Sequence, residues 1–107
     1  MNSWLLLLCA GLFEIGFTTC MKLSEGFTVI SYTLGFLVCA ALSFLLLNKS
    51  LNTIPLGTAY AVWTGLGAFG TALIGMLYFK DPVSFSRSLF LILLIGSVLG
   101  LKMVSAK

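Results

Sequence analysis

The chain has 107 residues, of which 60% are hydrophobic and only 8% are charged, and its mean hydropathy is +1.14. A soluble domain carries about 25% charged residues, so this composition excludes an ordinary water-soluble protein and makes lipid the expected solvent. The net charge of +3 comes from basic residues that are scattered singly, which argues against nucleic-acid binding.

The first predicted membrane helix covers about 4–22 and contains Glu14 as its one acidic residue. A carboxylate in the middle of a bilayer costs roughly 2.5–3.5 kcal/mol unless a proton or a cation neutralises it. The stretch lacks the basic region and the clean cleavage site of a signal peptide, so this span is expected to be retained. Glu14 therefore predicts a site that handles ions or protons.

Two more helices follow, one at about 29–48 and one at about 55–79. A polar turn at 22–26 separates the first helix from the second, and Pro55 suits the first turn of the third. The third helix is expected to stop before Pro82, because proline cannot continue a helix interior.

The fourth helix is expected at about 85–104, with Ser84 or Ser86 as its cap. One span needs about 20 residues, so four spans leave only short loops and no room for an extramembrane domain. The segment lengths and the lack of period-2 alternation favour helices over a β-barrel. We therefore expect a single all-α integral membrane domain over 1–107 with four transmembrane helices.

The basic residues are balanced across the membrane. If the N-terminus is on side one, that side carries Lys49, Lys102 and Lys107, and side two carries Lys22, Lys80 and Arg87. An excess of Lys and Arg normally fixes the topology, so this chain is expected to insert in both orientations. Many transporters consist of two inverted halves, which such a chain supplies as an antiparallel dimer. A monomer or a parallel oligomer with an accidental charge balance is the alternative.

Small residues on two helices predict close packing and bending. Gly96 and Gly100 have the spacing of helices that pack closely, and we expect them at a dimer contact. Generic tight packing explains this pair equally well. Gly65 and Gly67 offer little resistance to a change of backbone angle, which predicts a conformational hinge in the third helix.

The face of the first helix that carries Glu14 offers room for a ligand. Residues three and four apart share a helix face, so Glu14 lies beside Gly11, Phe17 and Thr18. Ser43 is the hydroxyl deep in the second helix. It can hydrogen-bond a carboxylate or, alternatively, the backbone of its own helix.

Aromatic side chains lie at the middle of the third helix. Tyr60, Trp63 and Thr64 share a face, away from the helix ends where interfacial aromatic belts lie. They either pack as ordinary core residues or line a cation site, where aromatic faces add about 0.5–2 kcal/mol of attraction. A proton and a cation would compete for the same carboxylate, and this competition becomes antiport if the dimer changes shape only when the site is filled.

Catalytic and metal chemistry are not expected. The sequence has no His, which removes the usual metal ligand and the usual base at neutral pH. Cys9, Cys20 and Cys39 lie in apolar runs and are expected to be small buried side chains. Since no activated nucleophile is visible either, we expect neither an enzyme nor a bound cofactor.

Three features together resemble the small multidrug resistance (SMR) family over essentially the whole chain: Glu14 in the first of four short helices, the segment 21–27 (MKLSEGF), and the segment 55–63 (PLGTAYAVW). The resemblance implies an antiparallel, dual-topology homodimer in the bacterial inner (plasma) membrane, with the substrate site at the dimer centre. It also implies exchange of protons for organic cations, with Glu14 as the shared carboxylate and with Tyr60 and Trp63 lining the site.

The subtype is mixed. The segments 63–68 and 100–102 and the serine Ser43 resemble the guanidinium-exporter branch, whereas 18–27 resembles the multidrug branch. Phe17 stands where the guanidinium branch usually has Trp, and Phe has no N–H donor. Export of guanidinium-type cations is the main prediction. The alternatives are a promiscuous exporter of quaternary ammonium and lipophilic cations, one subunit of a heterodimeric pair, and a non-transporting assembly protein.

Overall fold

The protein consists of four long helices in the computed structural model, which describes residues 2–105; Lys107, counted above among the basic residues, lies outside it. The helices are α1 (Ser3–Leu23), α2 (Ile30–Ser50), α3 (Leu56–Leu77) and α4 (Phe85–Ser105). All four are long and apolar enough to cross a membrane. The expected all-α fold with four helices of membrane-spanning length is therefore confirmed.

Local hydrogen bonds set where two of the helices begin. The side chain of Asn2 accepts the backbone N–H of Trp4 at 2.7 Å and caps α1. The hydroxyl of Ser84 accepts the backbone N–H of Arg87 at 3.1 Å at the start of α4. Of the two serines considered for this cap, the structure selects Ser84 and not Ser86.

The end of α3 comes at Leu77, before the expected limit at 79. The N–H of Asp81 donates to the carbonyl of Gly75 at 2.9 Å, and Lys80 next to it has a left-handed backbone with φ of 61°. This arrangement satisfies carbonyl groups that a helix leaves free at its C-terminus. The backbone therefore closes the helix before the following proline is reached.

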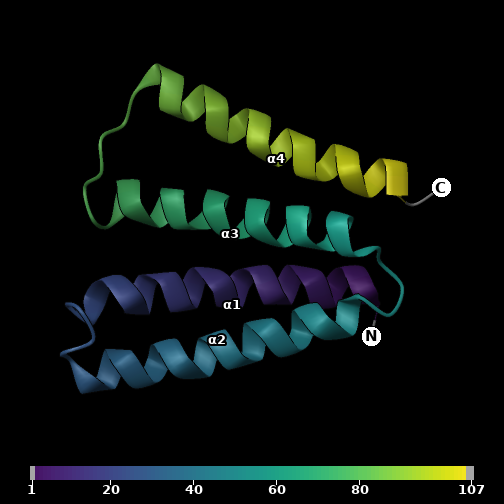
Figure 1. Cartoon of the computed structure of the whole chain (residues 1–107). Coiled ribbons are helices and arrows are strands. Elements are labelled where there is room, and N and C mark those ends of the chain that lie inside the picture. Colours follow the sequence, from purple (N-terminus) through teal and green to yellow (C-terminus); the bar gives the residue numbers. More distant parts are fainter. Residues whose placement is uncertain (1, 106–107) are drawn as a thin grey trace.

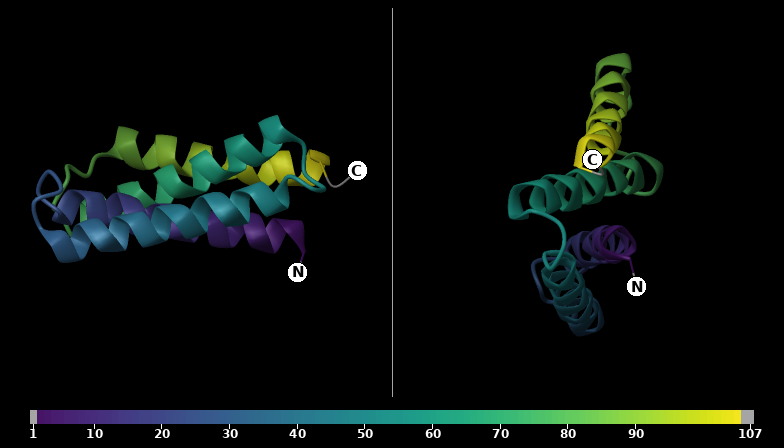
Figure 2. Two further views of the ribbon diagram at one scale, coloured as in Figure 1. Left: turned by 60° about the horizontal axis from the view of Figure 1, so that its bottom comes forward. Right: turned by 90° about the vertical axis from the view of Figure 1, so that its right-hand side faces the viewer.

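The helices lie side by side in the order α2, α1, α3, α4, and both chain ends lie at the same end of the molecule (Figure 1). α1 packs along both α2 and α3, whereas the backbone of α4 packs along α3 and contacts neither α1 nor α2 within the described residues. Seen along the helices, α4 projects away from the other three instead of closing a four-helix bundle (Figure 2).

Small residues bring α1 and α2 together. Gly16 of α1 lies against the sulfur of Cys39, and Gly35 of α2 lies against the sulfur of Cys20. A Cβ atom added at either glycine would lie only 3.2 or 3.1 Å from that sulfur. These two cysteines thus serve as partly buried packing side chains with free thiols, and Cys9 is also a free thiol.

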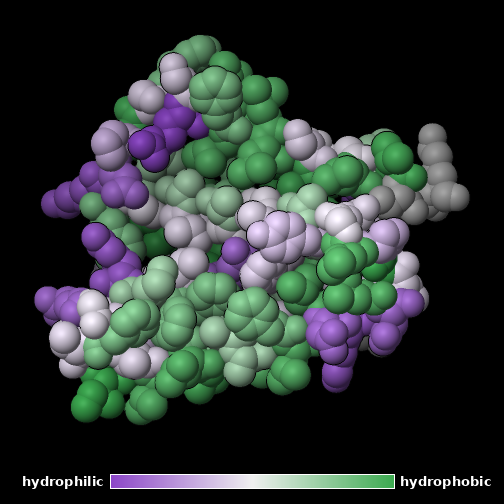
Figure 3. Space-filling model, in the orientation of Figure 1, coloured by the Kyte–Doolittle hydropathy of each residue, from purple (hydrophilic) through white to green (hydrophobic). Residues whose placement is uncertain are grey.

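The surface of the molecule is apolar along most of its length. Hydrophobic side chains cover most of the face shown in Figure 3, and hydrophilic ones gather toward its two ends. Few apolar side chains are fully enclosed by protein, and among residues 2–105 the buried core consists of Leu7, Ala10, Ile54, Ala59, Val62, Trp63 and Val98. An exposed apolar surface of this extent is what a lipid environment requires.

Candidate functional site

Glu14 lies in the middle of α1, and its carboxylate rests against Gly67 of α3. A Cβ atom at Gly67 would overlap the carboxylate, so the missing side chain provides the space that the acid occupies. The Oε1 atom of Glu14 is buried and has no hydrogen-bond partner among residues 2–105. A buried acceptor without a partner is costly, so this oxygen is available to a group from outside the described residues.

A second buried oxygen without a partner lies on the facing helix. Within the described part of the chain, Thr64 Oγ1 forms no hydrogen bond, and Thr64 precedes Gly67 by one turn of α3. Buried polar atoms almost always have a hydrogen-bond partner in native structures. Two such atoms on adjacent helices mark the α1–α3 contact around Glu14 as a place for a polar ligand.

Ser43 connects three helices. Its side chain is fully buried, and its hydroxyl donates to the carbonyl of Ala10 in α1 at 2.7 Å. The same oxygen accepts the indole N–H of Trp63 in α3 at 2.9 Å. Ser43 therefore bonds neither Glu14 nor its own helix. It holds the Trp63 ring in one orientation and ties α2 to both of its neighbours.

Aromatic rings form a continuous wall from α3 to α2. Trp63 lies between Tyr60, at 6.0 Å between ring centroids, and Phe44, at 5.5 Å. Phe44 stacks on Phe17 at 6.1 Å, and Phe17 meets the edge of Phe36 at 5.8 Å. Tyr60 is 59% exposed, so this end of the wall is open. Phe17 and Trp63 thus belong to one aromatic surface on the helices that hold Glu14.

Two of the residues expected beside Glu14 are engaged with α3. Gly11 is buried and faces Leu66, since a Cβ atom added at Gly11 would lie 3.0 Å from Leu66 Cβ. The Thr18 hydroxyl pairs with the Thr71 hydroxyl at 2.7 Å across the α1–α3 contact. These contacts keep the two helices together above and below the carboxylate.

The remaining glycines singled out in the sequence have distinct surroundings. Gly65 and Gly67 lie within the uninterrupted helix α3, where Gly65 packs against Val98 of α4. A Cβ atom added at Gly96 or Gly100 would meet no atom of another helix within 4 Å among the described residues. The surface of α4 at these two positions is therefore open.

Sequence reasoning missed Phe36, Phe44 and Thr71. Phe36 precedes Ser43 by two helical turns, and Phe44 follows Ser43 directly. Thr71 lies two turns after Thr64. Helical spacing from the residues already singled out was the signal that would have found Phe36 and Thr71, whereas no spacing rule points to Phe44.

Comparison with known proteins identifies the family. A family model described as Small Multidrug Resistance protein matches residues 2–95. The chain belongs to this family. This SMR chain is 40% identical to a guanidinium exporter of Yersinia pestis over 103 residues, and this aligned region covers 96% of the chain and 99% of that protein. It is 41% identical over 105 residues to the probable guanidinium efflux system subunit GdnD of Bacillus subtilis, which covers 98% and 100%.

A guanidinium exporter of Salmonella typhimurium is also similar to this SMR chain, with 38% identity over 101 residues that cover 94% of the chain and 96% of the relative. The predicted resemblance to the family, and to its guanidinium-exporter branch, is confirmed. With four helices of membrane-spanning length, the SMR chain is a multi-pass inner-membrane protein. The names of its relatives, exporter and efflux system subunit, describe transporters and not enzymes.

Proposed function

We propose that this SMR chain works as an antiparallel dimer that exports guanidinium-type cations in exchange for protons. The observation that carries the proposal is the Glu14 carboxylate, which lies in a helix of membrane-spanning length. Its buried Oε1 atom has no hydrogen-bond partner among the described residues. An acid in that position must be neutralised by a ligand from outside. Relatives with about 40% identity are named guanidinium exporters, which supports the choice of cation.

The chemistry of the site suits a planar cation. Guanidinium presents its N–H donors in a fork, and carboxylates accept such a fork with two parallel hydrogen bonds. Two copies of the chain would supply two Glu14 carboxylates. The face of Trp63, fixed by its hydrogen bond to Ser43, adds cation–π attraction. Tyr60, which lies beside Trp63 and is mostly exposed, can close the open side of the site.

Coupling follows from competition for one group. A proton and a guanidinium ion each neutralise the Glu14 carboxylates, and a site that holds neither leaves bare charge inside the membrane. If only the neutralised dimer exchanges the side to which its site opens, each crossing carries either protons or the cation. Gly65 and Gly67 are the proposed hinge for this change.

The dimer itself rests on two features of the chain. The end of the molecule that holds the α1–α2 and α3–α4 links carries Lys22, Lys80 and Arg87, and the other end carries Lys49 and Lys102 among the described residues. This near balance favours insertion in both orientations. The open surface at Gly96 and Gly100 gives α4 a place to pack against the α4 of a second copy.

The deciding experiment measures guanidinium-driven currents in proteoliposomes that contain only this purified chain. We expect the addition of guanidinium to produce proton-coupled currents. We also expect Glu14→Gln to abolish these currents while the dimer stays intact in detergent. Glu25→Gln, in the exposed α1–α2 turn, is the matched control and should keep the currents. Loss of assembly in Glu14→Gln, combined with a silent wild type, would instead favour a protein in which the acid only holds helices together.

A promiscuous exporter of quaternary ammonium and lipophilic cations is the second candidate. The observation that favours it is the stack of Phe17, on the same helix as Glu14, on Phe44 of α2, which places apolar rings without N–H donors beside the helix that holds Glu14. Quaternary ammonium ions offer no donors and bind through charge and aromatic contact. Currents with tetrapropylammonium and none with guanidinium would select this candidate over guanidinium export.

A heterodimer is the third arrangement to test, because the Bacillus subtilis relative is named as a subunit of an efflux system. A chain that is silent alone and active after a second SMR protein is added would show that it needs a different partner. Currents from the purified chain alone would establish that it is sufficient.

A further inference from the structure

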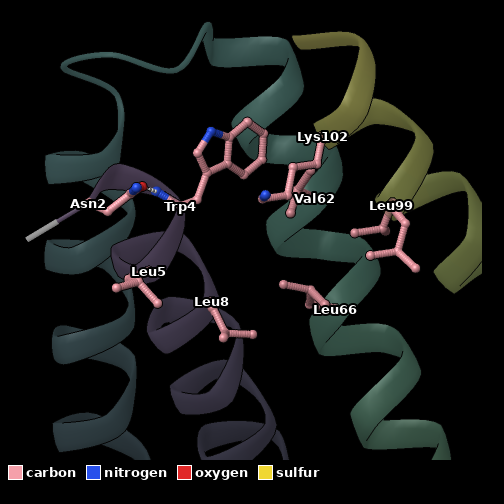
Figure 4. A pocket seen from close by; sticks show the side chains of 9 residues that line it. Asn2, Trp4, Leu5, Leu8, Val62, Leu66, Leu99 and Lys102 are labelled. Atoms are coloured by element: carbon pink, nitrogen blue, oxygen red, sulfur yellow. Dashed lines mark hydrogen bonds between the residues drawn. The ribbon is translucent and has the colours of Figure 1, made fainter. Parts of the chain in front are cut away.

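A long apolar groove lies between α1, α3 and α4. Because α4 packs on α3 but not on α1, two cavities open between them, one of about 340 Å³ and one of about 290 Å³. Leu8 and Leu66 line both cavities, so the two adjoin and form one groove. Figure 4 shows these two side chains pointing toward each other from α1 and α3, with Leu99 of α4 beyond them. Glu14 lines neither cavity, although Gly11, one turn before it, lines the second, so the groove passes beside the candidate cation site without including the carboxylate.

One end of the groove carries a positive charge. Lys102 lines the groove, and its Nζ atom lies 5.5 Å from the centre of the Trp4 ring, toward which it is turned in Figure 4. Asn2 completes this mouth. A Lys and a Trp at the end of a membrane helix lie at the depth of the lipid headgroups.

Lys102 has no acidic side chain at its end of the molecule. The sequence contains three acidic residues. Glu14 lies in the middle of α1, whereas Glu25 and Asp81 lie in the links at the opposite end (Figure 1). The cation near the mouth of the groove therefore has no acidic side chain to pair with among the described residues.

We propose that this groove binds a phospholipid with a net negative headgroup, with one acyl chain between α1 and α4 and the phosphate on Lys102. The apolar lining matches a hydrocarbon chain. Cavities of about 300–1,000 Å³ are of the size that holds small ligands. The single cation at the mouth complements the headgroup charge. A bound chain would fill the space between α4 and α1, where the backbones of the two helices are not in contact and Lys102 reaches Trp4 only at the mouth.

Trp4 gives the proposal its own reporter. The sequence has two tryptophans, so a Trp63→Phe background leaves Trp4, which lines the groove, as the fluorescent group. This protein is reconstituted in phosphatidylcholine bilayers in two series. One series contains increasing fractions of brominated phosphatidylglycerol, and the other contains increasing fractions of brominated phosphatidylcholine, with the bromine on the acyl chains in both. Bromine quenches tryptophan on contact. We expect brominated phosphatidylglycerol to reach half-maximal quenching at a fraction about fivefold lower than that of brominated phosphatidylcholine. This ratio corresponds to about 1 kcal/mol per Lys near a membrane surface.

Matched variants separate the groove from general surface charge. Lys102→Gln should remove the preference for phosphatidylglycerol, whereas Lys49→Gln, at the same end of the molecule, should keep it. Leu8→Phe should reduce quenching by both lipids, because the larger side chain fills the groove. Circular dichroism and dimer size show that each variant remains folded.

Three results would overturn the proposal. Equal quenching of Trp4 by both lipids, with Lys102 and Leu8 in place, would show that the groove has no headgroup preference. An equal loss of preference in Lys49→Gln and Lys102→Gln would assign it to surface charge alone. Absence of quenching by either lipid would mean that protein, such as a second copy of the chain, closes the groove. Because quenching requires no transport, a failure here is independent of the proposed export of guanidinium.

Discussion

The three helices α1, α2 and α3 are held together differently from α4. Hydrogen bonds between helices join the first three: Ser43 bonds both Ala10 and Trp63, and Thr18 bonds Thr71. In a bilayer, where few other partners exist for a polar group, such contacts fix the relative rotation of the helices.

Among the described residues, the contacts that join α4 to α3 are apolar. Val98 is its one buried side chain in that part of the chain, and it packs against Gly65. The hydroxyl of Ser97 bonds the carbonyl of Leu93 in its own helix. The comparison teaches that polar contacts organise the helices that hold Glu14, while α4 leaves its surfaces free for lipid or for a second copy.

The largest expected effect within the three-helix unit is that of Gly67→Ala. The added Cβ atom would overlap the Glu14 carboxylate, so the acid or α3 must move. We expect guanidinium-driven current to fall by about tenfold, which lies within the usual 1–3 kcal/mol of overpacking. Gly57→Ala on the same helix is the control, because an added Cβ atom there meets nothing within 4 Å. Full activity of Gly67→Ala would show that the carboxylate does not need this space.

A change on α4 should act on assembly and not on the fold of one chain. Gly96→Leu adds a large side chain to an open surface of α4. If α4 packs against a second copy there, the dimer should weaken by about tenfold, again through overpacking, while helix content stays the same. Single-molecule photobleaching at decreasing protein-to-lipid ratios measures this equilibrium. Ser86→Leu, exposed in the first turn of α4, is the control, and an identical dimer in Gly96→Leu would place the contact elsewhere.

Ser43→Ala tests the connection between the three helices. The substitution leaves the buried indole N–H of Trp63 without its acceptor. We expect a loss of about 1 kcal/mol in the free energy of unfolding, measured by denaturation in mixed micelles. Ser97→Ala, which removes a hydroxyl bonded only within α4, should cost less. Equal losses in the two variants would mean that the Ser43 contacts contribute nothing beyond an ordinary hydroxyl.

The smallest expected effect is that of Thr71→Val. The variant keeps the shape of the side chain and removes the hydrogen bond to Thr18. Interhelical hydrogen bonds in membrane proteins contribute about 0.6 kcal/mol on average, so unfolding should become easier by roughly that amount. Thr33→Val, whose hydroxyl bonds the carbonyl of Val29 within its own segment, is the control. A larger loss than in Ser43→Ala would reverse the ranking of the two connections.

Most residues of the candidate site were singled out from the sequence, but the contacts between them were not. Helical spacing placed Thr18 on the face of Glu14, yet its partner Thr71 is 53 positions away. The hydroxyl of Ser43 was expected to reach a carboxylate or its own backbone, and it bonds the backbone of α1 instead. Spacing within a helix reports which residues share a face. It does not report how two helices are rotated against each other, and that rotation decides these contacts.

The sequence alone determined that the chain resides in a membrane, that it forms four helices and that it belongs to the SMR family, because apolar length, turn residues and motifs are local properties. It also singled out Glu14, since a charge in an apolar span is conspicuous without any fold. Only the tertiary structure decided that the acid lies on Gly67, that Ser43 orients Trp63, and that a groove separates α4 from α1. These features arise where helices distant in sequence meet, and their geometry depends on packing of the whole chain.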